Sequence, residues 1–220
     1  MKTLILLAAL SGLCSNGFSA EQEENGFVSL FNGRDLRGWI GATQSYAVEE
    51  CVLYAKPDKA GNLMLEKKYA DFVLRFDFVL PPNGNNGVMV RMKEAEGAGT
   101  KNGMEIQILD DGGDQHKKLA DYQYNGSIYG VVPAKRGFLK PVGQWNSEEV
   151  RAIGSRITVV LNGTVIVDQD LKEVQKTLDG KEHPCLHNAS GYLGFMAHHS
   201  RVGIRNIRIK EVPPAPGNKP

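Results

Sequence analysis

The chain has 220 residues, and 26 lysine and arginine residues face 25 aspartate and glutamate residues, for a formal net charge of +1 at pH 7. This balance creates no basic field, so the sequence argues against a nucleic-acid partner. Hydrophobic residues make up 41% of the chain, and a chain of about this length can bury the core of one substantial domain.

The first 20 residues predict a secretory signal peptide. A positive charge precedes an apolar run at 4–10 that is too short to span a bilayer, and small residues up to Ala20 predict the cleavage region. We therefore expect a periplasmic or secreted protein. Lipid attachment at Cys14 is the alternative, disfavoured by the large side chain of Leu13. Because no second apolar run of membrane-spanning length follows, we expect no membrane span.

From residue 27 onward, short extended segments alternate with glycine, asparagine, aspartate and proline, with almost no helical periodicity. Many short strands separated by turn residues are typical of an antiparallel β-sandwich. The Asn-Gly pair at 162–163 predicts a tight hairpin, because these residues tolerate positive φ. Alternating aromatic residues at 72–80 predict a central core strand. The predicted strands are 27–31, 46–55, 62–65, 72–80, 87–92, 103–109, 126–131, 146–153, 156–161, 164–168, 191–197 and 202–210.

One domain is predicted over residues 21–211. Only 168–178 could form a short helix, and we expect it on the surface. The proline-rich tail 212–220 has too little apolar content to pack and is predicted to be disordered. Cys51 and Cys185 remain after leader removal, and they either form a disulfide or stay as buried thiols.

The stretch 103–113 is the centre of the functional interpretation. Apolar residues at 104, 106 and 108 alternate with Glu105 and Gln107, which predicts a half-buried strand. The carboxylate and the amide then share one face, about 7 Å apart. Such a pair on a rigid strand can hold a polar ligand, and the alternative is an exposed strand face with two solvated side chains.

Other polar side chains could converge on this strand. Residues 83–87 lead into a strand in which Met89 and Arg91 share a face, so Arg91 would stand beside Glu105 if the two strands pair. One interpretation is a surface ion pair of little energetic value. The other is a donor fork for sugar hydroxyls or a developing oxyanion.

Aromatic and imidazole groups add further candidates. Tyr129 suits a sugar ring that stacks on aromatic faces, although tyrosine is also an ordinary strand former. His198 and His199 end a strand and point to opposite faces, so only one of them can join a given site. An imidazole can move protons near neutral pH, and its alternative role is a structural hydrogen bond. No metal-ligand spacing is present, so the cofactor is unknown and a divalent metal is left open.

Motifs in a fixed order along the chain resemble those of a known family. They are found at 30–39, 86–91, 103–110, 126–129, 143–146, 161–163 and 191–206. In this order they resemble the bacterial 3-keto-disaccharide hydrolase domain, and they cover nearly the whole mature chain. The resemblance implies a concanavalin A-like jelly-roll β-sandwich of two antiparallel sheets, with a sugar groove on the concave sheet.

The resemblance also implies a glycoside hydrolase or lyase that acts on 3-keto-glycosides or 3-keto-disaccharides. Glucanases of related shape place two catalytic glutamates on one strand in the pattern Glu-x-Asp-x-Glu, whereas Leu109 stands in the second position here, so their mechanism is not expected. A ketone at C3 acidifies the C2 proton instead. One base can remove that proton, the C1 substituent then leaves by elimination, and water adds afterwards.

On this hypothesis Glu105 or His198 is the base, and Arg91 or a divalent metal stabilises the enolate oxygen. Substrate positioning is expected from Gln107, Asp110, Asn86 and Tyr129. A non-catalytic carbohydrate-binding module is the main alternative, since a fold does not determine function. A structural or adhesion domain is a third alternative, which predicts no groove.

Overall fold

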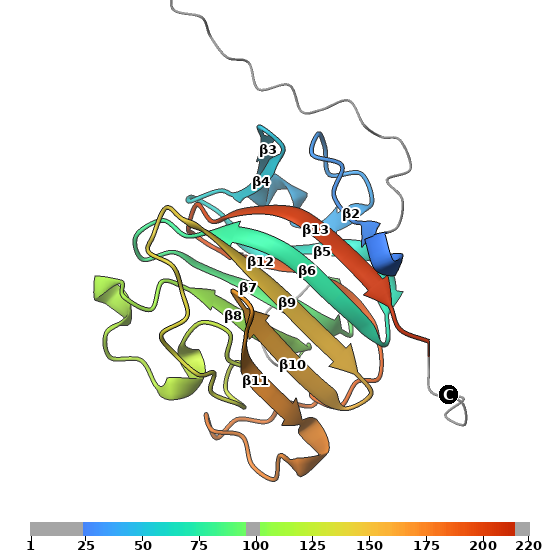
Figure 1. Cartoon of the computed structure of the whole chain (residues 1–220), viewed down its shortest axis with the longest axis vertical. Helices are drawn as coiled ribbons and strands as arrows, with labels where there is room; N and C mark the ends of the chain where they lie inside the picture. Colours follow the sequence, from blue (N-terminus) through green and yellow to red (C-terminus); the bar gives the residue numbers. More distant parts are fainter. Residues whose placement is uncertain (1–23, 96–101, 214–220) are drawn as a thin grey trace, which may run out of the picture.

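The computed structural model describes residues 24–95 and 102–213. Within these ranges thirteen strands form two antiparallel sheets that pack face to face (Figure 1). The predicted all-β sandwich is therefore confirmed. The predicted signal peptide (1–20) lies outside the described residues, and so does the predicted tail (212–220) beyond residue 213.

The larger sheet has the strand order β11-β10-β9-β6-β13-β4-β3, with β1 also paired to β13, and the smaller sheet has the order β2-β5-β12-β7-β8. The strands are β1 (Val28–Ser29), β2 (Trp39–Gly41), β3 (Tyr46–Glu49), β4 (Val52–Ala55), β5 (Ala60–Tyr69), β6 (Phe72–Val79), β7 (Asn85–Met92), β8 (Met104–Leu109), β9 (Trp145–Ile153), β10 (Arg156–Leu161), β11 (Thr164–Asp170), β12 (Gly191–His198) and β13 (Gly203–Glu211). Short 3₁₀ turns are η1 (Glu24–Gly26), η2 (Thr43–Ser45), η3 (Asp114–His116), η4 (Asp121–Gln123) and η5 (Leu171–Glu173).

The core lies between the two sheets, and β6 shows why the sequence builds it. Its aromatic residues alternate with residues that face outward, which is the pattern of a strand with one buried face. Phe76 of β6 meets Phe195 of β12 edge to face, with ring centroids 5.4 Å apart, so the two sheets interlock through aromatic packing. β6 lies between β9 and β13, which confirms the predicted central strand.

Turn chemistry explains where the strand prediction succeeded and failed. Asn162 and Gly163 both have positive φ and connect β10 to β11, as predicted. The predicted strand 46–55 is wrong, because it is a hairpin of β3 and β4 that turns at Glu50 and Cys51. Both turn residues have positive φ, at 49° and 63°. Neither is a glycine or an asparagine, so no residue at this turn signals it in the sequence.

Further features of the structure differ from or refine the expectations. β2 was not predicted, and Ile128 of the predicted strand 126–131 forms only isolated bridges. The candidate helix 168–178 contains only the single turn η5. Cys185 is buried and forms no disulfide, so a bond between Cys51 and Cys185 is excluded. Across the described residues, no helix has the length and apolar character needed to cross a membrane.

One carboxyl group lies in the core itself. Glu148 of β9 is opposite Phe76 on β6 and Leu161 on β10, and its exposed fraction is 2%. Neither of its carboxyl oxygens has a hydrogen-bond partner among the described residues. Burial disfavours the charged form and raises the pKa of Glu148 to about 8.

This burial predicts a dependence of stability on pH. The folded protein keeps the Glu148 proton up to about pH 8, whereas a glutamate of ordinary pKa 4.5 in the unfolded chain loses it. The folded state binds more protons in this window, so the free energy of unfolding falls as pH rises. Glu148→Gln should remove that fall and be more stable than the wild type at pH 8, by on the order of 2–4 kcal/mol.

Urea unfolding at several pH values between 4.5 and 8 measures this effect. Glu149→Gln is the matched control, because the Glu149 carboxylate is paired with Arg75 on the outer face of the sheet. If the free energy of unfolding changes with pH in the same way for the wild type and Glu148→Gln, the account is contradicted.

Candidate functional site

The register of β7 and β8 places the candidate carboxylate. Glu105 is opposite Met89, and Gln107 is opposite Gly87. Apolar neighbours of Glu105 on β8, such as Ile106, belong to the core cluster. Glu105 and Gln107 therefore lie on the outer face of the smaller sheet. The predicted strand is confirmed, but both side chains are nearly buried, with exposed fractions of 6% and 5%.

His198 reaches this carboxylate from the other side of β7. β12 pairs with β7 so that Met196 is opposite Gly87, which puts His198 on the same outer face. Its Nε2 atom lies 3.3 Å from Glu105 Oε1. The imidazole is 34% exposed and the carboxylate is 7% exposed. The two residues that the sequence offered as alternative bases therefore form one pair, joined across the intervening strand.

Gly87 makes this pairing possible. A Cβ atom at position 87 would lie 2.3 Å from Glu105 Oε1 and 2.7 Å from Glu105 Cγ, which no real contact permits. The Glu105 carboxylate thus packs directly on the backbone of Gly87, where it reaches His198. Sequence analysis did not identify this role, although a glycine inside a strand pattern often marks such a close approach.

Gln107 holds the same carboxylate oxygen. With its amide nitrogen as the donor, Gln107 Nε2 lies 3.1 Å from the Asn86 carbonyl oxygen and 3.3 Å from Glu105 Oε1. Glu105 Oε1 then receives a hydrogen from an amide and faces an imidazole. Among the described residues, Glu105 Oε2 accepts no hydrogen bond.

Tyr129 belongs to the segment that pairs with β8 on the side away from β7, next to Glu105. The Tyr129 amide donates to the Glu105 carbonyl at 2.9 Å, and Ile128 bridges to Ile106, so residues 126–129 extend the smaller sheet beyond β8. Gln123 Nε2 donates to the Tyr129 hydroxyl oxygen at 2.8 Å. The phenolic proton of Tyr129 is thereby directed away from Gln123. The sequence indicated Tyr129 as a site residue but did not indicate Gln123.

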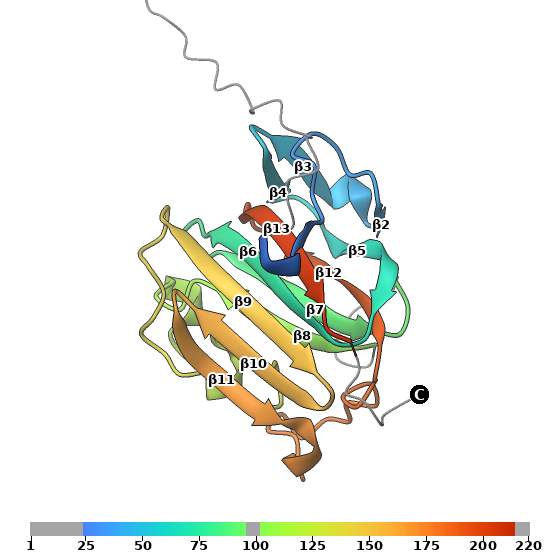
Figure 2. The same cartoon turned by 45° about the vertical axis from the view of Figure 1, so that its right-hand side comes forward.

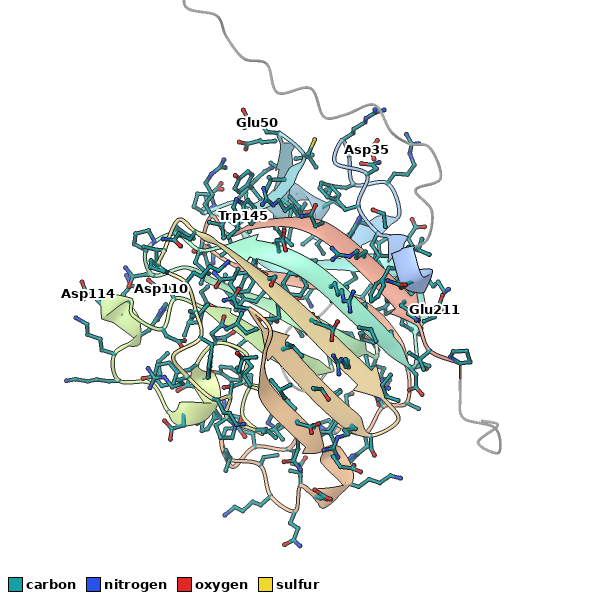
Figure 3. All side chains as sticks on the ribbon, in the orientation of Figure 1. Asp35, Glu50, Asp110, Asp114, Trp145 and Glu211 are labelled. Carbon is teal, nitrogen blue, oxygen red and sulfur yellow. The ribbon has the colours of Figure 1, made fainter. Side chains whose placement is uncertain are left out.

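Asp110 lies in the loop after β8, on the same side of the molecule as Asp114 (Figure 3). Its carboxylate accepts hydrogen bonds from the backbone amides of Asn83 (2.8 Å) and Gly112 (3.2 Å). Asp110 therefore ties this loop to the turn before β7. Contact of Asp110 with a substrate stays a prediction.

The predicted position of Arg91 is wrong. Between the pairs Met89–Gly194 and Met92–Tyr192, β7 has two residues where β12 has one, so β7 bulges there. Arg91 has a φ of 53° and turns off the face that it would share with Met89.

The Arg91 guanidinium is used by the fold instead. It is 2% exposed and donates to the carbonyl oxygens of Ala70, Gly154 and Asn188 and to the Asp71 carboxylate. Arg91 thus joins three turns, and it is not the donor that we expected beside Glu105.

The prediction for Asn86 also needs correction. Asn86 shares the core face of β7 with Val88, and its exposed fraction is 0%. Its side chain accepts a hydrogen bond from the neighbouring Gly87 amide. Only the main-chain carbonyl of Asn86 takes part in the site, through Gln107. The alternation of side chains places Asn86 and Gly87 on opposite faces, and the sequence motif did not show this.

The sequence left open whether the site binds a divalent metal, and the side chains near Glu105 can now be compared with the ligands that a metal needs. Glu105 and His198 provide two adjacent ligand groups, but the described residues contain no group of three or more histidine, cysteine, aspartate or glutamate side chains that could hold a metal ion. The residues described at the site do not form a metal centre, and we derive no step through a metal.

The sugar groove expected at Glu105 stays a prediction. At the site itself, a nearly buried carboxylate lies beside a partly exposed imidazole. Two hollows lie elsewhere in the described part of the chain, one lined by parts of 174–187 and the other by residues of the larger sheet.

Comparison with known proteins shows the family of the chain. Residues 26–210 match the 3-keto-α-glucoside-1,2-lyase-like domain family, which confirms the resemblance expected from the motifs. A 3-keto-disaccharide hydrolase of Bacteroides thetaiotaomicron is 22% identical over 86% of this chain and 79% of its own length.

Solved structures support the same grouping. A candidate glycosyl hydrolase of Parabacteroides distasonis superimposes with a TM-score of 0.75 at 27% identity, covering 84% of this chain and 99% of that one. The exoplasmic domain of VIP36, in a form with calcium and mannose bound, has a TM-score of 0.53 at 10% identity over 90% of this chain and 92% of its own. This last likeness shows the fold alone and confirms a lectin-like, concanavalin A-like sandwich.

Replacing Gly87 tests the geometry directly. Gly87→Ala should displace the Glu105 carboxylate and separate it from His198, because the new methyl group would occupy the carboxylate's position. We expect the His198 imidazole resonances to shift in NMR spectra. Gly112→Ala is the control, since a Cβ there meets nothing closer than 3.6 Å. Unchanged His198 imidazole resonances in Gly87→Ala would show that the pair does not depend on this glycine.

Proposed function

Because the chain belongs to the 3-keto-α-glucoside-1,2-lyase-like family, we propose that it cleaves 3-keto-glycosides by removing the C2 proton and expelling the C1 substituent. The substrate class is suggested by the relative from Bacteroides thetaiotaomicron, which is named a 3-keto-disaccharide hydrolase. The observation that supports the chemistry is the contact between Glu105 and His198 across Gly87. An acid–base pair is what an elimination followed by hydration needs.

Glu105 is the base in this proposal. Its Oε1 atom is held by Gln107 and His198, and its Oε2 atom is left to accept the C2 proton. A second carboxylate for a glucanase-type displacement is missing from the strand, because position 109 is a leucine. A single base suffices here, since the C3 ketone makes the C2 proton acidic.

Tyr129 replaces Arg91 as the donor to the enolate oxygen. Its hydroxyl oxygen accepts a hydrogen bond from Gln123, so its own proton can be donated to the C3 oxygen as negative charge develops there. Arg91 cannot take this role, because its guanidinium is engaged by backbone carbonyls at the turns.

His198 is the general acid that protonates the leaving group. When the bond from C1 to the glycosidic oxygen breaks, the electrons of the former C2–H bond form the C1=C2 double bond. The leaving oxygen then takes a proton from the partly exposed imidazole of His198. Water then adds to C1 and gives one proton back to His198. The proton held by Glu105 exchanges with solvent at this stage, so the carboxyl group returns a solvent hydrogen to C2.

Binding of a sugar without turnover is the rival function. A carboxylate and an imidazole meet here at 3.3 Å, and the backbone of Tyr129 is hydrogen-bonded to that of Glu105. This convergence favours the enzyme. We also propose that the protein acts in the periplasm or outside the cell, on the sequence evidence for a leader.

Neutralising the base is the first test. Glu105→Gln should reduce the cleavage of a 3-keto-glucoside by about 10²–10⁴-fold, the range expected for loss of a general base. Product formation is followed by chromatography, with and without a chelator. Glu66→Gln, which changes an exposed glutamate of β5, is the control. Turnover by Glu105→Gln close to that of the wild type would discard the assignment.

Removing the tyrosine hydroxyl tests the enolate donor. Tyr129→Phe keeps the ring and loses one hydrogen bond that strengthens as the enolate forms. We expect kcat to fall by about 10–10³-fold with little change in KM, because the interaction is made mainly in the transition state. Tyr122→Phe, which alters the neighbouring ring of the edge-to-face pair, is the control. A change confined to KM would assign Tyr129 to substrate binding alone.

A further inference from the structure

The segment that connects η5 to β12 runs along the lower end of the molecule in the view of Figure 2. Residues of this segment line a hollow that does not include Glu105. Its volume is about 530 Å³, within the range of small-ligand sites. The segment that lines it runs from 174 to 187, and the proposed function above makes no use of it.

A buried histidine–aspartate pair lies at this hollow, and its histidine, His183, is one of the lining residues. His183 Nε2 lies 3.1 Å from Asp179 Oδ1 and 3.2 Å from Asp179 Oδ2, and the two side chains are only 3% and 5% exposed. Burial raises the pKa of Asp179, but hydrogen bonds from the Lys181 amide and from His183 outweigh it and leave the pKa below its usual range. Buried titratable pairs of this kind often mark functional sites.

The pair is fixed in place by Gly130. A Cβ atom at position 130 would lie 2.6 Å from Asp179 Oδ2 and 2.9 Å from His183 Cε1, so the two side chains pack directly on the backbone there. The amides of Leu178 and Asp179 also donate to the Gly130 carbonyl, at 2.8 and 3.1 Å. The ion pair is therefore a fixed part of the fold.

The lining of the hollow is mainly cationic. Lys176 and Lys181 are exposed and line it, and Glu182 is the one acidic residue among its lining residues in the described part of the chain. Two lysines and a histidine that is hydrogen-bonded to a carboxylate thus line the same hollow.

We propose that this hollow binds an anionic sugar, with Lys176, Lys181 and His183 donating to its carboxylate or phosphate oxygens. The ring hydroxyls would be held by polar side chains such as Gln175. The orientation of His183 by Asp179 fixes one ring nitrogen and directs the other edge of the ring toward the ligand. This site is independent of Glu105 and of the reaction proposed there.

Isothermal titration calorimetry with glucuronate, glucose 6-phosphate and glucose tests the proposal. We expect saturable binding of at least one of the two anionic sugars, weaker at higher salt, and at least tenfold weaker binding of neutral glucose. The double variant Lys176→Gln/Lys181→Gln should weaken the anionic sugar at least tenfold. Lys210→Gln changes an exposed lysine on β13 and should bind like the wild type.

The outcomes separate this site from the catalytic proposal. Glu105→Gln should bind the anionic sugar as tightly as the wild type, whether or not Glu105 is the base. A response to only one of the two anionic sugars identifies the group as carboxylate or phosphate. The proposal is overturned if neither binds, if the double lysine variant binds equally well, or if inorganic phosphate and acetate bind as tightly as the sugars.

Discussion

The Glu105 carboxylate lies where any side chain at position 87 would have to be. The lack of a side chain at position 87 determines the geometry of the site, because it lets Glu105 of β8 contact His198 of β12 across β7. The contact depends on two registers at once, that of β7 with β8 and that of β7 with β12. A slip of one residue in either pairing would turn Glu105 or His198 to the opposite face. The interlocked aromatic core behind the sheet therefore protects the geometry of the site.

Alternation along strands was the reliable signal in the sequence. It predicted the sandwich, the central strand β6 and the outer face shared by Glu105 and Gln107. It also predicted that only one of His198 and His199 can join a given site, because neighbouring residues on a strand point to opposite faces. These predictions succeed because they rest on a period of two residues, which holds wherever a strand is regular.

The failures occur where the strands are irregular. The bulge at Arg91 breaks the period, so a residue two positions after Met89 no longer shares its face. The turn at Glu50 and Cys51 adopts positive φ without the residues that favour it. Gln123 and Gly130 act through loops whose path no periodicity describes. Asn86 differs from these, because alternation alone would have placed its side chain in the core.

The central claim is that Glu105 takes the C2 proton during bond cleavage, and the fate of that hydrogen tests it most directly. A 3-keto-glucoside labelled with deuterium at C2 would be cleaved in ordinary water, with the label in unreacted substrate measured in parallel to correct for spontaneous exchange. Elimination followed by hydration predicts that the product has lost the deuterium and holds a solvent hydrogen at C2. A product that retains the label at C2 would contradict the account and point to direct displacement at C1.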